Sequence, residues 1–186
     1  MTLQDKPTLI LIDIQKGFED LDYWGPRNNP EAEKIAGKLL AHWRKLGLPL
    51  FHVQHCSTNP NSKLAESNPG NAIMDVVAPL PGETVIKKNV NSAFIGTQLE
   101  QLLHAAGLHK LVFVGLTTDH CVSTSVRMAG NLGFEAYVVA DAVATFDKQG
   151  FDGKTYPAQL IHETALASLH GEFATVVQSE EIVGGG

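Results

Sequence analysis

The sequence predicts a three-layer α/β/α fold in one domain over residues 1–186, with a six-stranded, mainly parallel sheet in the Rossmann-like order 3-2-1-4-5-6. Two observations predict this fold. Short apolar segments alternate with helical segments along the whole chain, which requires right-handed crossovers onto one sheet. Most of the apolar segments are continuously apolar, as expected for strands that are buried on both faces of a parallel sheet.

Six segments have the length and composition of buried strands. They are residues 9–14, 50–54, 84–87, 111–115, 136–140 and 174–177. Four segments with apolar residues at helical spacing separate them, namely residues 31–46, 97–106, 119–132 and 157–169. A glycine follows each helical segment closely and favours the end of a helix there: Gly47, Gly107, Gly133 and Gly171.

The composition argues against several classes of protein. Apolar residues make up 44% and charged residues 18% of the 186 residues, which is typical of a globular domain. A net charge of -6, with dispersed lysines and arginines, argues against nucleic acid or membranes as partners. The N-terminus does not resemble a signal peptide, and Cys56 and Cys121 are the only cysteines. We therefore expect free thiols and a cytoplasmic protein.

Two long segments interrupt the alternation of strands and helices. Residues 57–71 are rich in Asn, Pro and Ser, and residues 146–156 contain Gly150 and Gly153. Long loops in a compact domain usually have a function. We expect lids or subunit contacts here, and the alternative is surface loops without a role.

Three complementary reactive side chains are expected at one edge of the sheet, where open α/β sheets bind ligands. Asp13 ends the first strand, Lys88 follows the third, and Cys121 follows the fourth. A lone buried carboxylate is costly, so Asp13 needs a cationic partner or a role in proton transfer, unless it caps the next turn. In the predicted strand order, the Lys88 side chain has to reach across roughly 10 Å.

Cys121 lies where a buried strand turns into a helix. Thr118 or Asp119 is a candidate cap for that helix, which puts the thiol in its first turn. The helix dipole contributes about 1 kcal/mol to a thiolate, whereas an ammonium at about 4 Å contributes on the order of 4 kcal/mol. Lys88 is therefore the expected main activator that keeps Cys121 ionised. The alternatives are an inert, buried Cys121, or Cys56 as a rival nucleophile that opens a loop.

Three motifs stand at three strand ends: LIDIQKGF at residues 11–18, KNVNSAF at residues 88–94 and GLTTDHCV at residues 115–122. In this order they resemble the isochorismatase-like cysteine hydrolases, the group that includes nicotinamidases and other small-amide hydrolases. The resemblance covers nearly the whole chain.

The resemblance implies a catalytic triad of Asp13, Lys88 and Cys121. It also implies a cis peptide bond between Leu116 and Thr117, and an oxyanion hole formed by the backbone N–H groups of Thr117 and Cys121. The implied activity is cleavage of an amide or ureido C–N bond of a small molecule through a thioester, with no cofactor. Relatives of this kind are often homodimers or homotetramers.

Nicotinamidases of this group carry a metal-binding Asp-x-His after the second strand, and this chain departs from that pattern. Gln54 stands there instead, and an amide is a poor metal ligand. His52 and His55 are three residues apart on a strand and point to opposite faces. We therefore expect no metal and a hydrogen-bonding role for His55. The residues expected to line the substrate pocket are Gln15, Phe18, Trp24, His55, Phe94 and His120.

Two other functions stay open on the same fold. An isochorismatase-type hydrolase cleaves a vinyl ether, which needs an acid and not a thiolate. A non-catalytic protein that binds small ligands is the second alternative. The chain has neither a Gly-x-Gly-x-x-Gly nor a Gly-x-Ser-x-Gly motif, which argues against dinucleotide binding and against a serine hydrolase.

Overall fold

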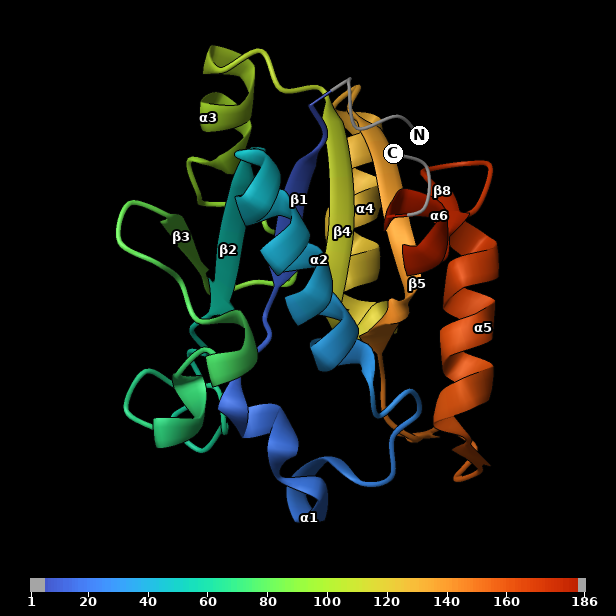
Figure 1. The fold of residues 1–186 in the computed structure, drawn as a ribbon. Coiled ribbons are helices and arrows are strands. Elements are labelled where there is room, and N and C mark those ends of the chain that lie inside the picture. Colours follow the sequence, from blue (N-terminus) through green and yellow to red (C-terminus); the bar gives the residue numbers. More distant parts are fainter. Residues whose placement is uncertain (1–5, 184–186) are drawn as a thin grey trace.

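The computed structural model describes residues 6–183, so the first five and last three residues of the predicted domain lie outside the described part. One parallel sheet forms its centre (Figure 1). The strand order is β3-β2-β1-β4-β5-β8, and every neighbouring pair is parallel. The strands are β1 (Thr8–Ile12), β2 (Leu50–His55), β3 (Thr84–Lys88), β4 (Lys110–Leu116), β5 (Glu135–Ala144) and β8 (Thr175–Val177). The predicted fold and strand order are confirmed.

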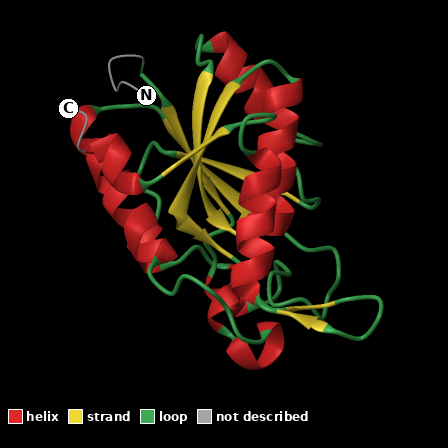
Figure 2. Ribbon diagram, turned by 90° about the vertical axis from the view of Figure 1, so that its right-hand side faces the viewer, coloured by secondary structure: helices red, strands yellow, loops and turns green. Residues whose placement is uncertain are grey.

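Helices cover both faces of the sheet (Figure 2). The longer helices are α2 (Ala32–Leu46), α3 (Leu99–Ala105), α4 (Ser123–Asn131) and α5 (Ala158–Leu169), and shorter ones are α1 (Leu21–Trp24) and α6 (Ser179–Val183). Three 3-10 turns, η2 (Lys16–Glu19), η3 (Pro69–Asn71) and η4 (Asp75–Val77), lie in the connections. Strands β6 (Lys148–Gln149) and β7 (Thr155–Tyr156) form a small antiparallel hairpin.

The period of two along the strands divides the core into two layers. In β1, Leu9 and Leu11 face the cluster that contains residues of α2 and α6, whereas Ile10 and Ile12 face the cluster with α3, α4 and α5. All of these side chains are almost completely buried. Strands buried on both faces read as continuous apolar runs, which is why the sequence predicted them well.

The boundaries differ from the prediction where the backbone departs from regular geometry. The first strand ends at Ile12, and β5 continues to Ala144 through a shift in its pairing with β4. The predicted helix over 119–132 is a π-helical turn, η5 (Thr118–Val122), that leads into α4. Among residues 6–183, no helix combines the length and the apolar character needed to cross a bilayer.

Candidate active site

Asp13 directly follows β1 and its backbone ends that strand. Its φ of 50° lies in the left-handed region, which costs an aspartate about 1–2 kcal/mol. The Asp13 N–H still donates to the Val53 carbonyl, while its own carbonyl accepts from the Gln15 N–H at 2.9 Å. The side chain is fully buried. Strained residues of this kind cluster at functional sites.

Gly115 allows β4 to pass close to the end of β1. Its φ is 120°, and a Cβ atom at this position would lie 2.0 Å from the carbonyl oxygen of Ile12. Any side chain would therefore push the two strands apart. One residue further on, the peptide bond between Leu116 and Thr117 is cis, the isomer that the resemblance implies.

Cys121 lies in the π-helical turn η5, between β4 and α4. No side chain caps this turn. Of the two candidate caps, Asp119 accepts a hydrogen bond from the Thr145 hydroxyl instead, and its carboxylate lies 3.5 Å from Lys148 Nζ. The hydroxyl of the other, Thr118, lies 3.0 Å from His162 Nδ1. π-Helical turns are rare and frequently occur at functional sites.

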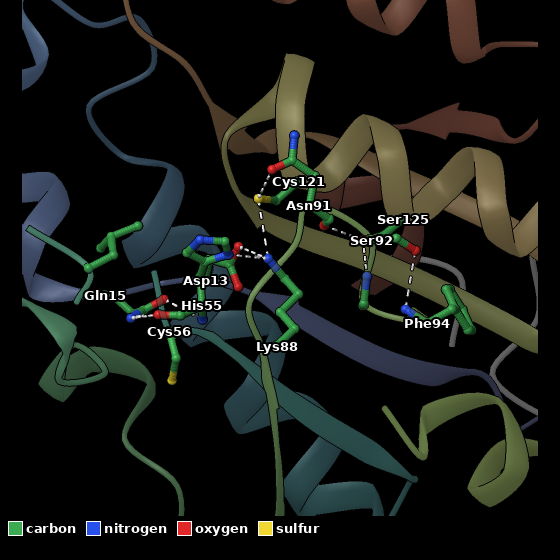
Figure 3. Close-up of polar contacts among 12 residues, drawn as sticks. Asp13, Gln15, His55, Cys56, Lys88, Asn91, Ser92, Phe94, Cys121 and Ser125 are labelled. Atoms are coloured by element: carbon green, nitrogen blue, oxygen red, sulfur yellow. Dashed lines mark hydrogen bonds and ion pairs between the residues drawn. The ribbon is translucent and has the colours of Figure 1, made fainter. Parts of the chain in front are cut away.

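The ammonium of Lys88 joins Asp13 and Cys121 (Figure 3). Lys88 Nζ lies 2.6 Å from Asp13 Oδ2 and 3.3 Å from Cys121 Sγ. The lysine reaches these groups from the end of β3 past β2, where its register partner is His55. Both the Lys88 and the Asp13 side chains are completely shielded from solvent. The three residues of the predicted triad are thus brought into direct contact.

The charge state of the site differs from the expectation. Burial and the Asp13 carboxylate raise the pKa of the Cys121 thiol to about 12, although Lys88 acts in the opposite direction. Burial also raises the pKa of Asp13 against the effect of Lys88. The expected resting thiolate is therefore wrong: one buried ammonium neutralises one carboxylate, and a thiolate would be a second, uncompensated anion.

The other carboxylate oxygen of Asp13 is available for a proton. Within the described part of the chain, Asp13 Oδ1 is buried and has no hydrogen-bond partner. The Cys121 thiol is among the groups that shift the pKa of this carboxyl. Asp13 is therefore well placed to exchange a proton with Cys121.

A cavity of about 130 Å³ opens onto the Cys121 thiol. Its lining residues are Phe18, Trp24, His55, Ser62, Leu64, Asn91, Thr117, His120, Cys121 and Lys148. The Phe18 and Trp24 rings lie 4.8 Å apart, and Phe146 stacks on Trp24 at 5.6 Å. A larger hollow of about 530 Å³ between α2 and α6 is lined by no cysteine, so we place the chemistry in the smaller cavity.

Two residues predicted for the pocket do not line this cavity. Gln15 is fully buried and holds the backbone of His55 by two hydrogen bonds. Phe94 belongs to the buried core cluster that contains residues of α3 and α4, and it stacks on Phe134 at 5.8 Å. Both residues come from motifs that reach the site, but they lie in the connections after β1 and β3, where strand alternation no longer sets the direction of a side chain.

Four lining residues were missed from the sequence. Ser62 and Leu64 come from the loop over residues 57–71, and Lys148 comes from the segment over 146–156. Both long loops therefore contribute to the cavity. Their unusual length indicated that they have a function but not which of their residues take part. Asn91 stands within the second motif and lies 3.8 Å from Cys121 Sγ through its Oδ1.

The metal set of nicotinamidases does not fit this chain. Ligand atoms of Asp13, His55 and Cys121 do lie within 4.8 Å of one another, a spacing that suits a metal ion. Lys88 Nζ, however, is within hydrogen-bond distance of all three, so a metal cation there would meet an ammonium. The amide of Gln54 is held by Asn71 instead.

His52 points away from the site, as its spacing from His55 predicted. Its Nε2 lies 2.9 Å from Glu83 Oε2, and its side chain is almost fully buried. It therefore belongs to a separate cluster. Cys56 lies beside Glu66 and Lys87, and burial is the main effect that raises the pKa of its thiol, against the lowering effects of Asn71 and Lys87. Unlike Lys88, Lys87 is exposed and paired with Glu66.

Comparison with known proteins agrees with this geometry. The isochorismatase domain family matches residues 7–181. The isochorismatase-family protein YrdC of Bacillus subtilis is 43% identical over 97% of this chain and 96% of its own length. Maleamate amidohydrolase of Pseudomonas putida is 29% identical over 95% of this chain and 84% of its own length.

A solved structure gives the same result for the fold. A protein of the isochorismatase family from Chromobacterium violaceum superposes with a TM-score of 0.93 at 48% identity, covering 97% of this chain and 93% of that one. The family match spans nearly all of the residues that form the sheet and its helices. The chain therefore belongs to the isochorismatase family and is a hydrolase.

Proposed function

We propose that this hydrolase cleaves a C–N bond of a small amide or ureide through a thioester on Cys121. One observation carries the proposal. A fully buried ammonium, Lys88 Nζ, bridges a carboxylate at 2.6 Å and a thiol at 3.3 Å beside a small cavity. A nucleophile, a base and an orienting group in contact are the requirements of covalent catalysis.

The first half of the reaction forms the thioester. The Cys121 thiol gives its proton to Asp13 as the sulfur attacks the carbonyl carbon. The oxyanion of the tetrahedral intermediate is bound by the backbone N–H groups of Thr117 and Cys121, both of which line the cavity. Protonated Asp13 then gives the proton to the leaving nitrogen, and ammonia or an amine departs as the C–N bond breaks.

The second half restores the enzyme. Asp13 takes a proton from water, and the resulting hydroxide attacks the thioester carbonyl. The C–S bond breaks, the acid product leaves, and the proton returns to the Cys121 sulfur. Throughout both halves Lys88 stays an ammonium. Only one negative charge is present in the site at each step, on Asp13, on the oxyanion or on the sulfur, and Lys88 balances it.

The cavity limits the size of the substrate. Its volume of about 130 Å³ is well below the roughly 300–1,000 Å³ of a drug-sized site. Relatives include maleamate amidohydrolase, nicotinamidase 3 of Arabidopsis thaliana and ureidoacrylate amidohydrolase of Agrobacterium fabrum. These names support a small amide or ureido substrate.

The test is ammonia release from a panel of maleamate, nicotinamide, ureidoacrylate and simple aliphatic amides, with Cys121→Ala and Cys121→Ser as controls. We expect turnover of at least one compound and an acyl adduct on Cys121 by intact-protein mass spectrometry. Folded enzyme that hydrolyses nothing on the panel would overturn the proposal, as would full activity of Cys121→Ala. Hydrolysis of a vinyl ether that persists after stoichiometric labelling of Cys121 would favour the ether hydrolase instead.

We further propose that the enzyme works in the cytoplasm, as the two free thiols of Cys56 and Cys121 suggest. Fractionation of the producing cells with an antibody against the chain tests this. Recovery of the protein outside the cytoplasmic fraction would contradict it.

A further inference from the structure

The Lys88 ammonium has three N–H bonds and three acceptors around it. Asp13 Oδ2 lies at 2.6 Å, His55 Nδ1 at 3.0 Å and Cys121 Sγ at 3.3 Å (Figure 3). A lysine ammonium has no acceptor capacity, so each contact uses one of its protons. The mechanism above uses the contacts with Asp13 and Cys121 and leaves the contact with His55 unexplained.

The contact fixes the tautomer of His55. Nδ1 can accept from Lys88 only if it carries no proton, so the proton of the neutral ring lies on Nε2. The ring also forms a hydrogen bond with the backbone of Val90. Burial and the charge of Lys88 lower the pKa of His55, with the nearby Asp13 carboxylate acting against them. The neutral ring is therefore the stable form beside Lys88 and Asp13.

The backbone of His55 is held as firmly as its ring. The His55 N–H donates to Gln15 Oε1 at 2.8 Å, and its carbonyl accepts from Gln15 Nε2 at 3.0 Å. Asn71 Nδ2 donates to the same carbonyl at 2.9 Å. Gln15 and Asn71 are both buried. A strand-end residue held by two buried amides has little freedom to move its ring away from Lys88.

We propose that His55 is a positioning residue, whose Nδ1 takes the third proton of the Lys88 ammonium and thereby holds it between Asp13 and Cys121. The proposal rests on the proposed function, because it assigns His55 a place in that same site. His55 and Lys88 are register partners on adjacent strands, which gives the ring a direct approach to the ammonium. By accepting this hydrogen bond, the ring limits the positions that the ammonium can take.

The first test is a matched pair of variants, His55→Asn and His55→Leu. Their side chains have similar shapes, but only Asn has an acceptor near the place of Nδ1. The readout is the rate at which iodoacetamide, itself a small amide, labels Cys121 between pH 7 and 9, followed by peptide mapping with Cys56 as internal reference. We expect His55→Leu to react about tenfold to a hundredfold more slowly than wild type, and His55→Asn to stay within about threefold.

Two outcomes of this test would overturn the proposal. Equal rates for wild type and both variants would show that the ammonium needs no third acceptor. Equally slow rates for both variants would show that the ring acts by its shape or by another bond. Thermal melts of both variants establish that they are folded.

The second test needs no variant. Long-range ¹H–¹⁵N spectra of the wild-type histidines report the tautomer, and we expect His55 to be neutral with its proton on Nε2 from pH 6.5 to 9. A proton on Nδ1 in that range would overturn the proposal. Neither test depends on turnover, so wild-type enzyme inactive on every amide would reject the proposed function while these results still decide the role of His55.

Discussion

The β2–β3 pair carries a polar cluster at each end, and the two clusters differ in how completely their charges are satisfied. At the amino end of β3, the Glu83 carboxylate accepts two hydrogen bonds from Arg44, one from the Leu80 N–H, and one from His52. The hydrogen bonds from Arg44 lead the effects that lower the pKa of Glu83 to about 2. Every contact there favours the charged form.

At the carboxyl end of β3, the balance is reversed. Lys88 has its three acceptors, but Asp13 Oδ1 has no partner among the described residues. Burial raises the pKa values of Asp13 and of Cys121, so both groups take up a proton more readily than they would in water. A carboxylate with a full set of hydrogen bonds stabilises the fold, whereas a buried carboxylate with an unpaired oxygen can exchange a proton more easily.

The largest effect is expected where a member of the buried ion pair is removed. Lys88→Met leaves Asp13 buried without its cation, so we expect a loss of about 3–5 kcal/mol in the free energy of unfolding. We also expect a fall of at least about 10³-fold in kcat/KM. Urea unfolding at pH 7.5 and the amide assay measure the two effects.

A double variant separates stability from catalysis in the same cluster. Asp13→Leu combined with Lys88→Met removes both charges, so most of the stability lost in the single variant should return while activity stays absent. A single variant that costs less than about 1 kcal/mol would show that the pair is less buried than its geometry indicates.

The second effect is on stability alone. Glu83→Gln should cost about 3 kcal/mol at pH 7, since the pKa of Glu83 falls from 4.5 when unfolded to about 2 when folded. This contribution is complete above pH 4.5 and is lost as the pH falls toward 2, so the gap to wild type should narrow in acid. Turnover should be unchanged. A loss of activity equal to that of Lys88→Met would erase the distinction between the clusters.

The third effect is the acid limb of the pH–rate profile. Asp13 must be a carboxylate in the free enzyme to accept the thiol proton, and burial raises its pKa above the ordinary 3.8. We expect kcat/KM to rise about tenfold per pH unit up to that raised pKa and then to level off. Glu83→Gln should show the same limb. A limb at or below pH 3.8 would contradict the role of Asp13.

The smallest effect concerns stability in alkali. The Cys121 thiol has a pKa of about 12 in the folded protein against an ordinary 9.0, so the folded state resists its ionisation. Wild-type stability should therefore fall as the pH rises above 9. Cys121→Ala lacks this penalty and should gain about 1 kcal/mol relative to wild type between pH 7 and pH 10. Cys56 is present in both proteins and cancels; parallel stability curves would contradict the raised pKa.

The fold could be predicted from the sequence because its strands are buried on both faces and its helices end at glycines. The differences between the predicted and the observed ends of strands have local causes. The left-handed backbone of Asp13 stops β1 early, and the shifted pairing near Gly115 lengthens β5. Neither feature has a signal in the hydrophobic pattern.

The site could be predicted only as a set of residues. Strand ends and motif order identified Asp13, Lys88 and Cys121, and the structure places them in contact. The charge state could not be predicted, because it depends on how burial and the Asp13 charge compare with the Lys88 charge at the sulfur. The place of Gln15, behind His55 and not in the cavity, depends on which way one buried side chain turns.

The neutral resting state of Cys121 has a consequence for the life of the enzyme. Peroxides attack thiolates and react slowly with thiols, so susceptibility to oxidation follows thiolate character. A sulfur whose pKa is raised to about 12 gives peroxide almost no thiolate to attack between turnovers. In the proposed mechanism Cys121 becomes a thiolate only as it attacks a substrate carbonyl, so the charge balance that raises its pKa should also slow its oxidation between turnovers.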